Sequence, residues 1–286
     1  MAPSAAAIVV DNASTDRSLA RARQALSDRP GANVIANPRN LGFAAAVNQG
    51  FAAVEQNLRV SSADCVLLLN PDVTLSTPLD PLERAALAHG LAAGQLTDSS
   101  GRPQTGFTIR RLPTAAALIF EMLGINRLWP GNPVNRRYRY LDRDLNQPGP
   151  VEQPAGAFLM IRRDVWRQLG GFDESFHPVW FEDVDFCRRA LDAGFRIEYL
   201  PQVKALHTGG HSVSQITVGC RMGYWYASLL RYAAKHLPPP AYRAVWLAAI
   251  LGAVPRMTVG MIQEKSLGPA SAAWECFRQA RTGQTQ

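Results

Sequence analysis

The chain has 286 residues, of which 47% are hydrophobic and 19% are charged. This balance is typical of a globular protein and excludes a disordered chain, and the length suffices for one large domain or two modest ones. The net charge of +7 fits an anionic membrane surface or a phosphorylated substrate. We expect no nucleic-acid partner, because the sequence carries no zinc finger and no aromatic strand of the RNA-binding type.

The cysteines and the first residues both indicate a cytoplasmic protein. The four cysteines are scattered and form no CxxC pair, as reduced core thiols do: Cys65, Cys187, Cys220 and Cys276. Residues 1–7 lack the basic start and the long apolar run of a secretory signal. We therefore expect a cytoplasmic location.

The first 90 residues alternate apolar runs with helical patterns. The runs predict strands at residues 5–10, 34–36 and 63–69, and the patterns predict helices at residues 18–26, 44–55 and 79–89. Such a βαβαβα order is typical of a parallel sheet with helices on its faces. Two of these strands end in polar turns, at Asp11-Asn12 and at Asn70-Pro71-Asp72, and ligands bind at the carboxyl ends of strands in such sheets.

After residue 90 this rhythm changes. Residues 95–110 predict a strand, a tight turn and a returning strand, whereas residues 126–150 predict a long exposed loop. The other expected elements are helices at residues 114–123, 163–169 and 182–193, and strands at residues 151–162, 195–200 and 203–206.

The chain from residue 218 onward is mostly helical in pattern, with a break at residues 238–240. Residues 242–262 are strongly apolar but include Arg243, Pro255 and Arg256, so they fall short of an uninterrupted membrane span of about 20 residues. Two interpretations stay open: an amphipathic helix lying at an anionic membrane surface, or a helix packed on the core.

The stretch from residue 180 to residue 189 mixes three acids, Glu182, Asp183 and Asp185, with large apolar side chains. Apolar surroundings raise the pKa of a carboxyl group towards the range useful for proton transfer. The alternative is an ordinary helix start, where acids are favoured by the helix dipole. Glu182 and Asp183 are adjacent and would point about 100° apart on a helix, so only one can act as a base.

Two further residues are candidate metal ligands. Asp72 ends a buried strand, and one carboxylate together with substrate phosphates suffices for Mg2+, although Asn-Pro-Asp is also a good turn. His207 follows a strand and precedes Gly209-Gly210, where a neutral imidazole would favour tolerance of Mn2+. His211 competes for this role, and a single histidine in a polar loop is more often no ligand.

Six motifs follow one another along the chain. They are VVDNASTD at 9–16, NLGF at 40–43, LNPDV at 69–73, GAFLMIRR at 156–163, GGFDE at 170–174, and EDVDFC at 182–187 followed by His207. Together they resemble the family 2 glycosyltransferases of GT-A fold, in the rhamnosyltransferase and galactofuranosyltransferase-like branch, over roughly residues 6–215.

The resemblance implies an α/β fold with a mixed sheet flanked by helices and a helical C-terminal extension. Residues 1–215 would form the glycosyltransferase domain, with the nucleotide part at about residues 5–90 and the acceptor part at about residues 91–215. Residues 216–286 would form a helical region for which membrane association is one option.

The resemblance also implies roles for single residues. Asp183 would be the general base, and Asp72 and His207 would bind a divalent metal, Mg2+ or Mn2+. The expected substrate-binding residues are Asp11 at the base or ribose, Asn12, Asn40 near the nucleotide, Gly156, Trp180 and Glu182.

The implied activity is the inverting transfer of a sugar from a nucleoside diphosphate to a hydroxyl of a glycan or polyprenyl-linked glycan. Rhamnose from dTDP-rhamnose is the first expectation, the pathway is cell-envelope polysaccharide synthesis, and the enzyme would sit in the cytoplasm or on the inner face of the plasma membrane. A nucleotidyltransferase is disfavoured, because the start lacks a glycine-rich basic phosphate loop.

The family pattern includes a strand, a turn and a helix before the VVDNASTD motif. Here Asp11 is only ten residues from Met1, so we expect this first unit to be missing and the sheet to have an exposed edge or a gap. An N-terminally truncated, catalytically incompetent relative is therefore the alternative to an active enzyme.

Overall fold

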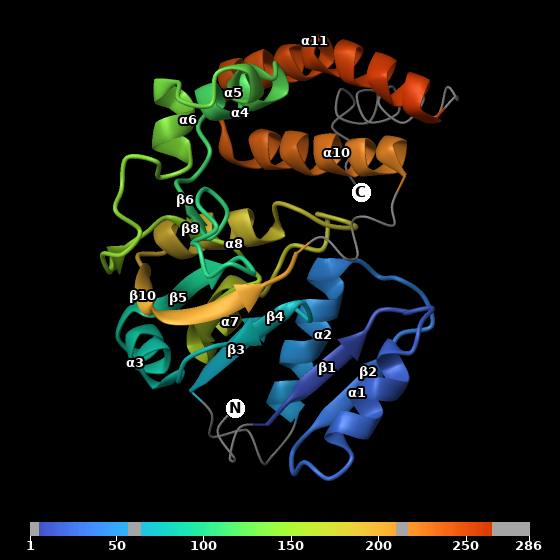
Figure 1. The fold of residues 1–286 in the computed structure, drawn as a ribbon, viewed down its shortest axis with the longest axis vertical. Helices are drawn as coiled ribbons and strands as arrows, with labels where there is room; N and C mark the ends of the chain where they lie inside the picture. Colours follow the sequence, from blue (N-terminus) through green and yellow to red (C-terminus); the bar gives the residue numbers. More distant parts are fainter. Residues whose placement is uncertain (1–5, 57–63, 210–216, 265–286) are drawn as a thin grey trace.

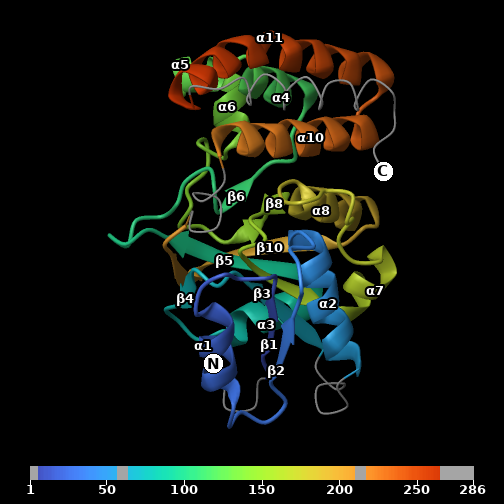
Figure 2. The same cartoon turned by 90° about the vertical axis from the view of Figure 1, so that its right-hand side faces the viewer.

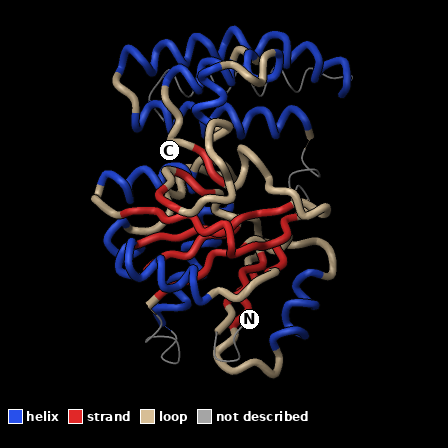
Figure 3. The backbone as a smooth tube through the Cα atoms, turned by 60° about the vertical axis from the view of Figure 1, so that its left-hand side comes forward, coloured by secondary structure: helices blue, strands red, loops and turns tan. Residues whose placement is uncertain are grey.

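The computed structural model describes residues 6–56, 64–209 and 217–264. A central sheet with helices on both faces forms one part of the molecule, and a layer of helices lies against it (Figures 1 and 2). The strands gather in the middle of the tube view, with helices on either side (Figure 3). Within the described ranges, no helix is long and apolar enough to cross a membrane.

The main sheet has six strands and is mixed. Along it lie β3 (Cys65–Leu69), β9 (Phe158–Arg162), β5 (Gly90–Thr97), β10 (Arg196–His207) and β4 (Val73–Leu75), with β7 (Gly149–Pro150) also paired to β10. Only the β5–β10 pairing is parallel. The mixed sheet of the expected fold class is confirmed, whereas the expectation that the third strand lies in a parallel sheet is wrong, because β3 pairs antiparallel with β9.

A gap separates the first two strands from this sheet. β1 (Ile8–Asp11) and β2 (Asn33–Ala36) pair in parallel and form a two-stranded sheet of their own. Helices α1 (Ser18–Leu26) and α2 (Phe43–Gln56) follow them in the chain. Over the described residues, no ladder joins β1 to β3, so β3 is an edge strand of the main sheet, in line with the expected exposed edge or gap.

Alternation along β9 creates the core on both faces of the sheet. Leu159 and Ile161 face a cluster with α2, α7 (Arg163–Leu169) and α8 (Glu182–Asp192), while Phe158 and Met160 face a cluster with α3 (Asp80–His89). Successive residues of a strand point to opposite faces, so a strand covered on both sides is apolar throughout.

The helical layer combines segments from the middle and the end of the chain. It consists of α4 (Ala115–Met122), α5 (Ile125–Leu128), α6 (Pro133–Tyr138), α10 (Val218–His236) and α11 (Pro239–Glu264). Its core also takes in Phe181 and Val184 from the start of α8, whose later residues Phe186 and Cys187 belong to the core of the sheet. Helix α8 therefore lies between the two cores and is packed on both sides.

Three local expectations are wrong. Residues 126–150 are not one exposed loop, since they include α5 and α6, where Asn132 caps α6 and is buried. The strand expected from residue 95 begins at Gly90 directly after α3. The two strands expected at residues 195–206 are one strand, β10, with a shift of register between Leu200 and Lys204.

Candidate active site

The structure brings Asp72 and His207 together although they are far apart in the sequence. Asp72 lies in the turn between β3 and β4, and His207 is the last residue of β10, which pairs with β4. The distance from His207 Nε2 to Asp72 Oδ2 is 3.5 Å, and both side chains are largely buried. Thr208 fixes this turn, because its backbone N–H and its hydroxyl both donate to the Asp72 carbonyl oxygen.

The tautomer of His207 is set by Gln104, a residue of the loop between β5 and β6 (Ile109–Arg110). The Gln104 Nε2 donates to the His207 carbonyl oxygen at 2.8 Å, so its Oε1 is the atom that faces His207 Nδ1, also at 2.8 Å. Because Oε1 can only accept, Nδ1 carries a proton, and in the neutral imidazole the lone pair therefore lies on Nε2. The Phe107 ring stacks on the imidazole, with centroids 5.0 Å apart.

The chemistry of these two residues fits a pair of ligands to a divalent metal. A carboxylate oxygen and an imidazole lone pair, both acceptors, face the same space, and a cation is the partner that both accept. No group of three or more His, Cys, Asp or Glu side chains is arranged to hold a metal in the part of the chain that the structure describes. The competing residue His211 lies outside the described residues.

Residues 155–157 join the separate parts of the site. Ala155 N–H donates to the Thr108 carbonyl at 3.0 Å, Gly156 N–H donates to Asp183 Oδ2 at 2.9 Å, and the Ala157 carbonyl accepts from Asn70 N–H at 3.0 Å. A Cβ on residue 156 would lie 3.1 Å from the Cβ of Asp183, so glycine permits this close approach. One short segment thus holds the Asp72 turn and Asp183 in place.

Asp183 is partly buried at the start of α8. Burial raises its pKa above the ordinary value, while the N–H of Gly156 and the charge of Arg110 act in the opposite direction. A carboxylate held by a backbone N–H and poorly solvated has the properties of a general base. The structure does not test the catalytic role expected for Asp183, but it gives the residue a defined position.

Glu182, next to Asp183, is almost wholly buried, with 4% of its surface exposed. Burial, followed by the charge of Asp183, raises its pKa well above the ordinary value. Its Oε2 has no hydrogen-bond partner among the described residues. The two neighbouring acids therefore differ: burial opposes the ionised form of Glu182 more strongly than that of Asp183.

The backbone before α8 is strained. Trp180 and Phe181 both adopt the left-handed conformation, with φ of 78° and 70°. For residues with a side chain this costs about 1–2 kcal/mol each. The conformation turns the chain sharply into α8, and Phe181 is packed in the core of the helical layer. Trp180 is partly buried and packs against the same core, and substrate contact by it stays a prediction.

The residues expected at the nucleotide are tied into one loop cluster. The Asn12 amide donates to Asn40 Oδ1 and to the Gly42 carbonyl, and it accepts from Asn37 Nδ2 and from Leu41 N–H. All of its bonding positions are thus used within the protein. Asp11, which is buried at the end of β1, accepts from Ser14 N–H. The structure assigns these residues a role in shaping the loops, and ligand contact by them stays a prediction.

Three residues of the site were not singled out from the sequence: Gln104, Phe107 and Arg110. They lie between β5 and the end of β6, and Arg110 faces both Phe107, at 5.9 Å from its ring, and the charge of Asp183. Nothing in the sequence of this segment marks it as functional. Its role follows from its position between the metal ligands and the acid pair.

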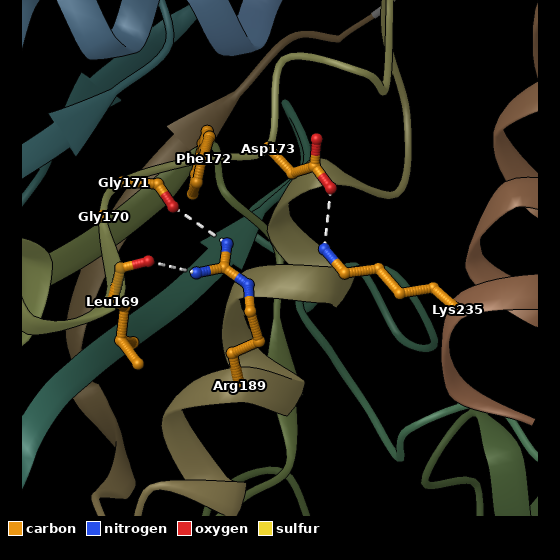
Figure 4. Close-up of a pocket in the computed structure, with 7 residues that line it drawn as sticks. All are labelled: Leu169, Gly170, Gly171, Phe172, Asp173, Arg189 and Lys235. Carbon is orange, nitrogen blue, oxygen red and sulfur yellow. Dashed lines mark hydrogen bonds and ion pairs between the residues drawn. The ribbon is translucent and has the colours of Figure 1, made fainter. Parts of the chain in front are cut away.

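A second cluster of charges fixes α8 to α10. Asp185 is fully buried, and burial alone would raise its pKa. It contacts His236 at 2.7 Å, Lys235 at 2.8 Å and Arg189 at 2.8 Å. These contacts outweigh the effect of burial, so the pKa of Asp185 lies below the usual value. Lys235 and Arg189 line a pocket of about 230 Å3 below Asp173 (Figure 4). The Lys235 ammonium also bonds Asp173 at 2.7 Å, so the cations of this pocket are already neutralised.

Comparison with known sequences agrees with this geometry. The family profile described as "Glycosyl transferase family 2" matches residues 5–170, and "Glycosyltransferase like family 2" matches residues 132–223. The N-acetylglucosaminyl-diphospho-decaprenol L-rhamnosyltransferase of Mycobacterium tuberculosis is 29% identical over 218 residues, covering 73% of this chain and 68% of the relative. Rhamnosyltransferase WbbL of Escherichia coli is 27% identical over 176 residues, covering 59% of this chain and 62% of the relative.

Comparison with solved structures supports the same fold. The crystal structure of GalNAc-T7 with UDP, GalNAc and Mn2+ matches with a TM-score of 0.50 and 14% identity. The match covers 81% of this chain but only 45% of the solved one, so the chain spans under half of that protein. The fold is that of the GT-A glycosyltransferases. Since one family profile covers more than half of its length, the chain belongs to glycosyltransferase family 2.

Proposed function

We propose that this transferase is an inverting, metal-dependent enzyme that moves rhamnose from dTDP-rhamnose to a hydroxyl of a lipid-linked glycan. The product would be a precursor of a cell-envelope polysaccharide, made on the inner face of the plasma membrane. The proposal rests on one observation above all. Asp72 and His207 converge to 3.5 Å, and residues 155–157 tie their turn to Asp183.

The residues of the site divide the chemistry between them. Asp183 would take the proton of the acceptor hydroxyl as that oxygen attacks the sugar, which is the task of a base with a raised pKa. Arg110, whose positive charge acts on Asp183, would counter the charge of the departing nucleoside diphosphate. Glu182, whose pKa is raised by burial and whose Oε2 has no partner in the described structure, would bind an acceptor hydroxyl.

Asp72 and His207 would hold the divalent metal. When bound, such a metal stabilises the negative charge that develops on the diphosphate leaving group. Gln104 keeps the His207 lone pair available, and burial of both ligands limits competition from water.

The names of the relatives support the choice of sugar and acceptor. The mycobacterial relative is named as a rhamnosyltransferase acting on a decaprenyl-diphosphate-linked sugar, and the Escherichia coli relative is also named as a rhamnosyltransferase. These names belong to proteins that share less than a third of their residues with this chain. They make rhamnose the first donor sugar to test.

The test measures product formation from dTDP-rhamnose and from UDP-sugars, with Mn2+ and with chelator. We expect metal-dependent transfer from dTDP-rhamnose, a loss of at least a hundredfold in Asp72→Asn, and unchanged transfer in Asp64→Asn, which alters an exposed acid just before β3. Transfer from another donor would reject the sugar. Equal rates with and without metal would reject the role of Asp72.

The gap between β1 and β3 favours a second candidate, a protein that keeps the scaffold but cannot bind a donor. Calorimetric titration with UDP and with dTDP, each with and without Mn2+, separates the two. Metal-dependent binding of either nucleotide would support a functional pocket despite the gap. The absence of binding to both would favour the incompetent protein.

A further inference from the structure

Exposed large hydrophobic side chains gather at one end of the molecule. Nine such side chains are exposed within the described residues, and all but Leu87 and Phe107 belong to α11 or to the corner between α4 and α6. They are Leu123, Leu128, Trp129, Leu247, Leu251, Val254 and Ile262. An apolar surface concentrated in this way marks a site of contact, whereas single scattered side chains would not.

Helix α11 presents an apolar face to solvent over most of its length. Its exposed large side chains recur every three to four residues up to Val254, as one face of a helix requires, and Leu251 and Ile262 are 67% and 72% exposed. Among the described side chains that are exposed between Leu247 and Ile262, none carries a charge. The opposite face, with Val245 and Ala249, is buried on α4 and α10. A helix in contact with water alone would carry polar residues on its outer face.

Tight packing makes α11 and the α4–α5 corner one surface. The Arg256 guanidinium of α11 donates to the carbonyl oxygens of Glu121, at 2.8 Å, and of Met122. Gly252 lies directly against the Met122 carbonyl, where any larger residue would collide. Figure 2 shows α5 beside one end of α11. Leu128 and Trp129, which are 86% and 59% exposed, therefore lie on a corner that is joined to α11.

The surroundings of this face are cationic. Residues 115–138 and 218–264 together contain eight Lys or Arg and only two acids. Arg127, Arg136, Arg137 and Arg243 are exposed at the surface of these helices. Apolar side chains bordered by arginines and a tryptophan complement an anionic bilayer, where apolar groups enter the lipid and cations meet the headgroups.

We infer that the outer face of α11 and the α4–α5 corner form a docking surface for an anionic lipid bilayer, on which α11 lies flat. The surface is defined by Leu123, Leu128, Trp129, Leu247, Leu251, Val254 and Ile262. This inference deepens the proposed function, because docking would bring the enzyme to an acceptor confined to a membrane. It rests on the proposed function only for that acceptor. The binding itself requires no donor and no catalysis.

The test is flotation of the full chain with vesicles of phosphatidylcholine alone or mixed with phosphatidylglycerol. We expect binding to the mixed vesicles that weakens with salt. Leu251→Gln and Trp129→Ser should each reduce it about tenfold, the change expected for losing the burial of one large apolar side chain. Leu87→Gln, at an exposed leucine on α3, is the matched control and should bind like the unmodified protein.

Unchanged binding in both variants would overturn the inference, as would a lack of binding to either kind of vesicle. Two further measurements test whether a second copy of the chain, or residues 265–286, occupies this face in place of a bilayer. The first is sedimentation of the same proteins. A dimer that Leu251→Gln dissociates would assign the face to a second copy. Vesicle binding that appears only after deletion of residues 265–286 would assign it to that segment. Transfer to a water-soluble acceptor, measured in parallel, tests the proposed function separately, since these variants should leave it unchanged.

Discussion

The side-chain amide of Gln104 holds His207 at two points, with Nε2 on the His207 carbonyl oxygen and Oε1 on Nδ1, each at 2.8 Å. Because the first bond fixes the orientation of the amide, the second fixes which imidazole nitrogen is protonated. In the neutral imidazole, Nε2, the nitrogen facing Asp72, keeps its lone pair. Gln104 is thus a positioning residue for the proposed metal site, acting through His207.

Gln104→Leu should lower the affinity for Mn2+ in the presence of dTDP by about 10- to 100-fold, the usual effect of removing the partner that orients a metal-binding histidine. Nucleotide binding without metal should stay unchanged. Isothermal titration calorimetry measures both. Gln202→Leu, which alters an exposed residue of β10, is the control. Equal loss in the presence and absence of Mn2+ would show that Gln104 supports only the fold.

Asp183→Asn should lower the rate of transfer by about 10²- to 10⁴-fold, because it removes the base and keeps the shape of the side chain. Binding of dTDP should be retained. In the unmodified protein the raised pKa of Asp183 means that the carboxylate is lost at a higher pH than in a free aspartate. The rate should therefore fall as the pH decreases, with a midpoint above the ordinary value of 3.8. A variant that retains full turnover would exclude Asp183 as the base.

The sequence predicts the candidate site residues that the structure brings together, but it does not predict the residues that support them. Asp72, Asp183 and His207 belong to motifs with a chemical signature, and the order of the motifs is enough to name the fold. Gln104 and Arg110 lie in the segment from the end of β5 to β6, which has no such signature. Their importance arises from the parallel pairing of β5 with β10, which brings this segment to His207, about 100 residues away in the sequence.

The wrong predictions about the fold also have physical causes. Residues 126–150 look like a loop because asparagine and proline are typical of turns, yet Asn132 uses its side chain to cap α6 and is buried there. The start of β5 was missed because Gly90-Leu91-Ala92-Ala93 follows α3 without a break and shows no strand periodicity. A strand buried on both faces has none, so only its tertiary contacts distinguish it from a helix.

Glu182→Gln should stabilise the protein at neutral and alkaline pH. The pKa of Glu182 is raised on folding, so the folded state holds its proton more tightly than the unfolded state. The stability of the unmodified protein therefore decreases as the pH rises above 4.5, the ordinary pKa of a glutamate. Glutamine does not titrate, so the variant lacks this loss of stability. Thermal unfolding from pH 4 to pH 9 should show a difference in Tm that is small at the acid end and grows with pH. A constant difference would mean that Glu182 is ionised in the folded protein.

Asp185→Asn should destabilise the protein by about 3 kcal/mol at neutral pH, because it leaves Arg189, Lys235 and His236 around a buried site without a negative charge. The pKa of Asp185 is lowered on folding, so the stability it contributes is present at neutral pH and is lost as the pH falls through the folded value. The difference between variant and unmodified protein should therefore shrink at acid pH.

The same helix offers a matched control for this change. Asp192 forms an i,i+4 pair with Arg188 at 2.8 Å, just as Asp185 does with Arg189, but the side chain of Asp192 is 56% exposed and that of Asp185 is 0% exposed. Asp192→Asn should change the free energy of unfolding by less than about 0.5 kcal/mol, since exposed pairs are well solvated when broken. Urea denaturation measures both variants. Equal effects would show that burial between α8 and α10 adds nothing to the Asp185 cluster, and that these contacts do not fix α8 against the helical layer.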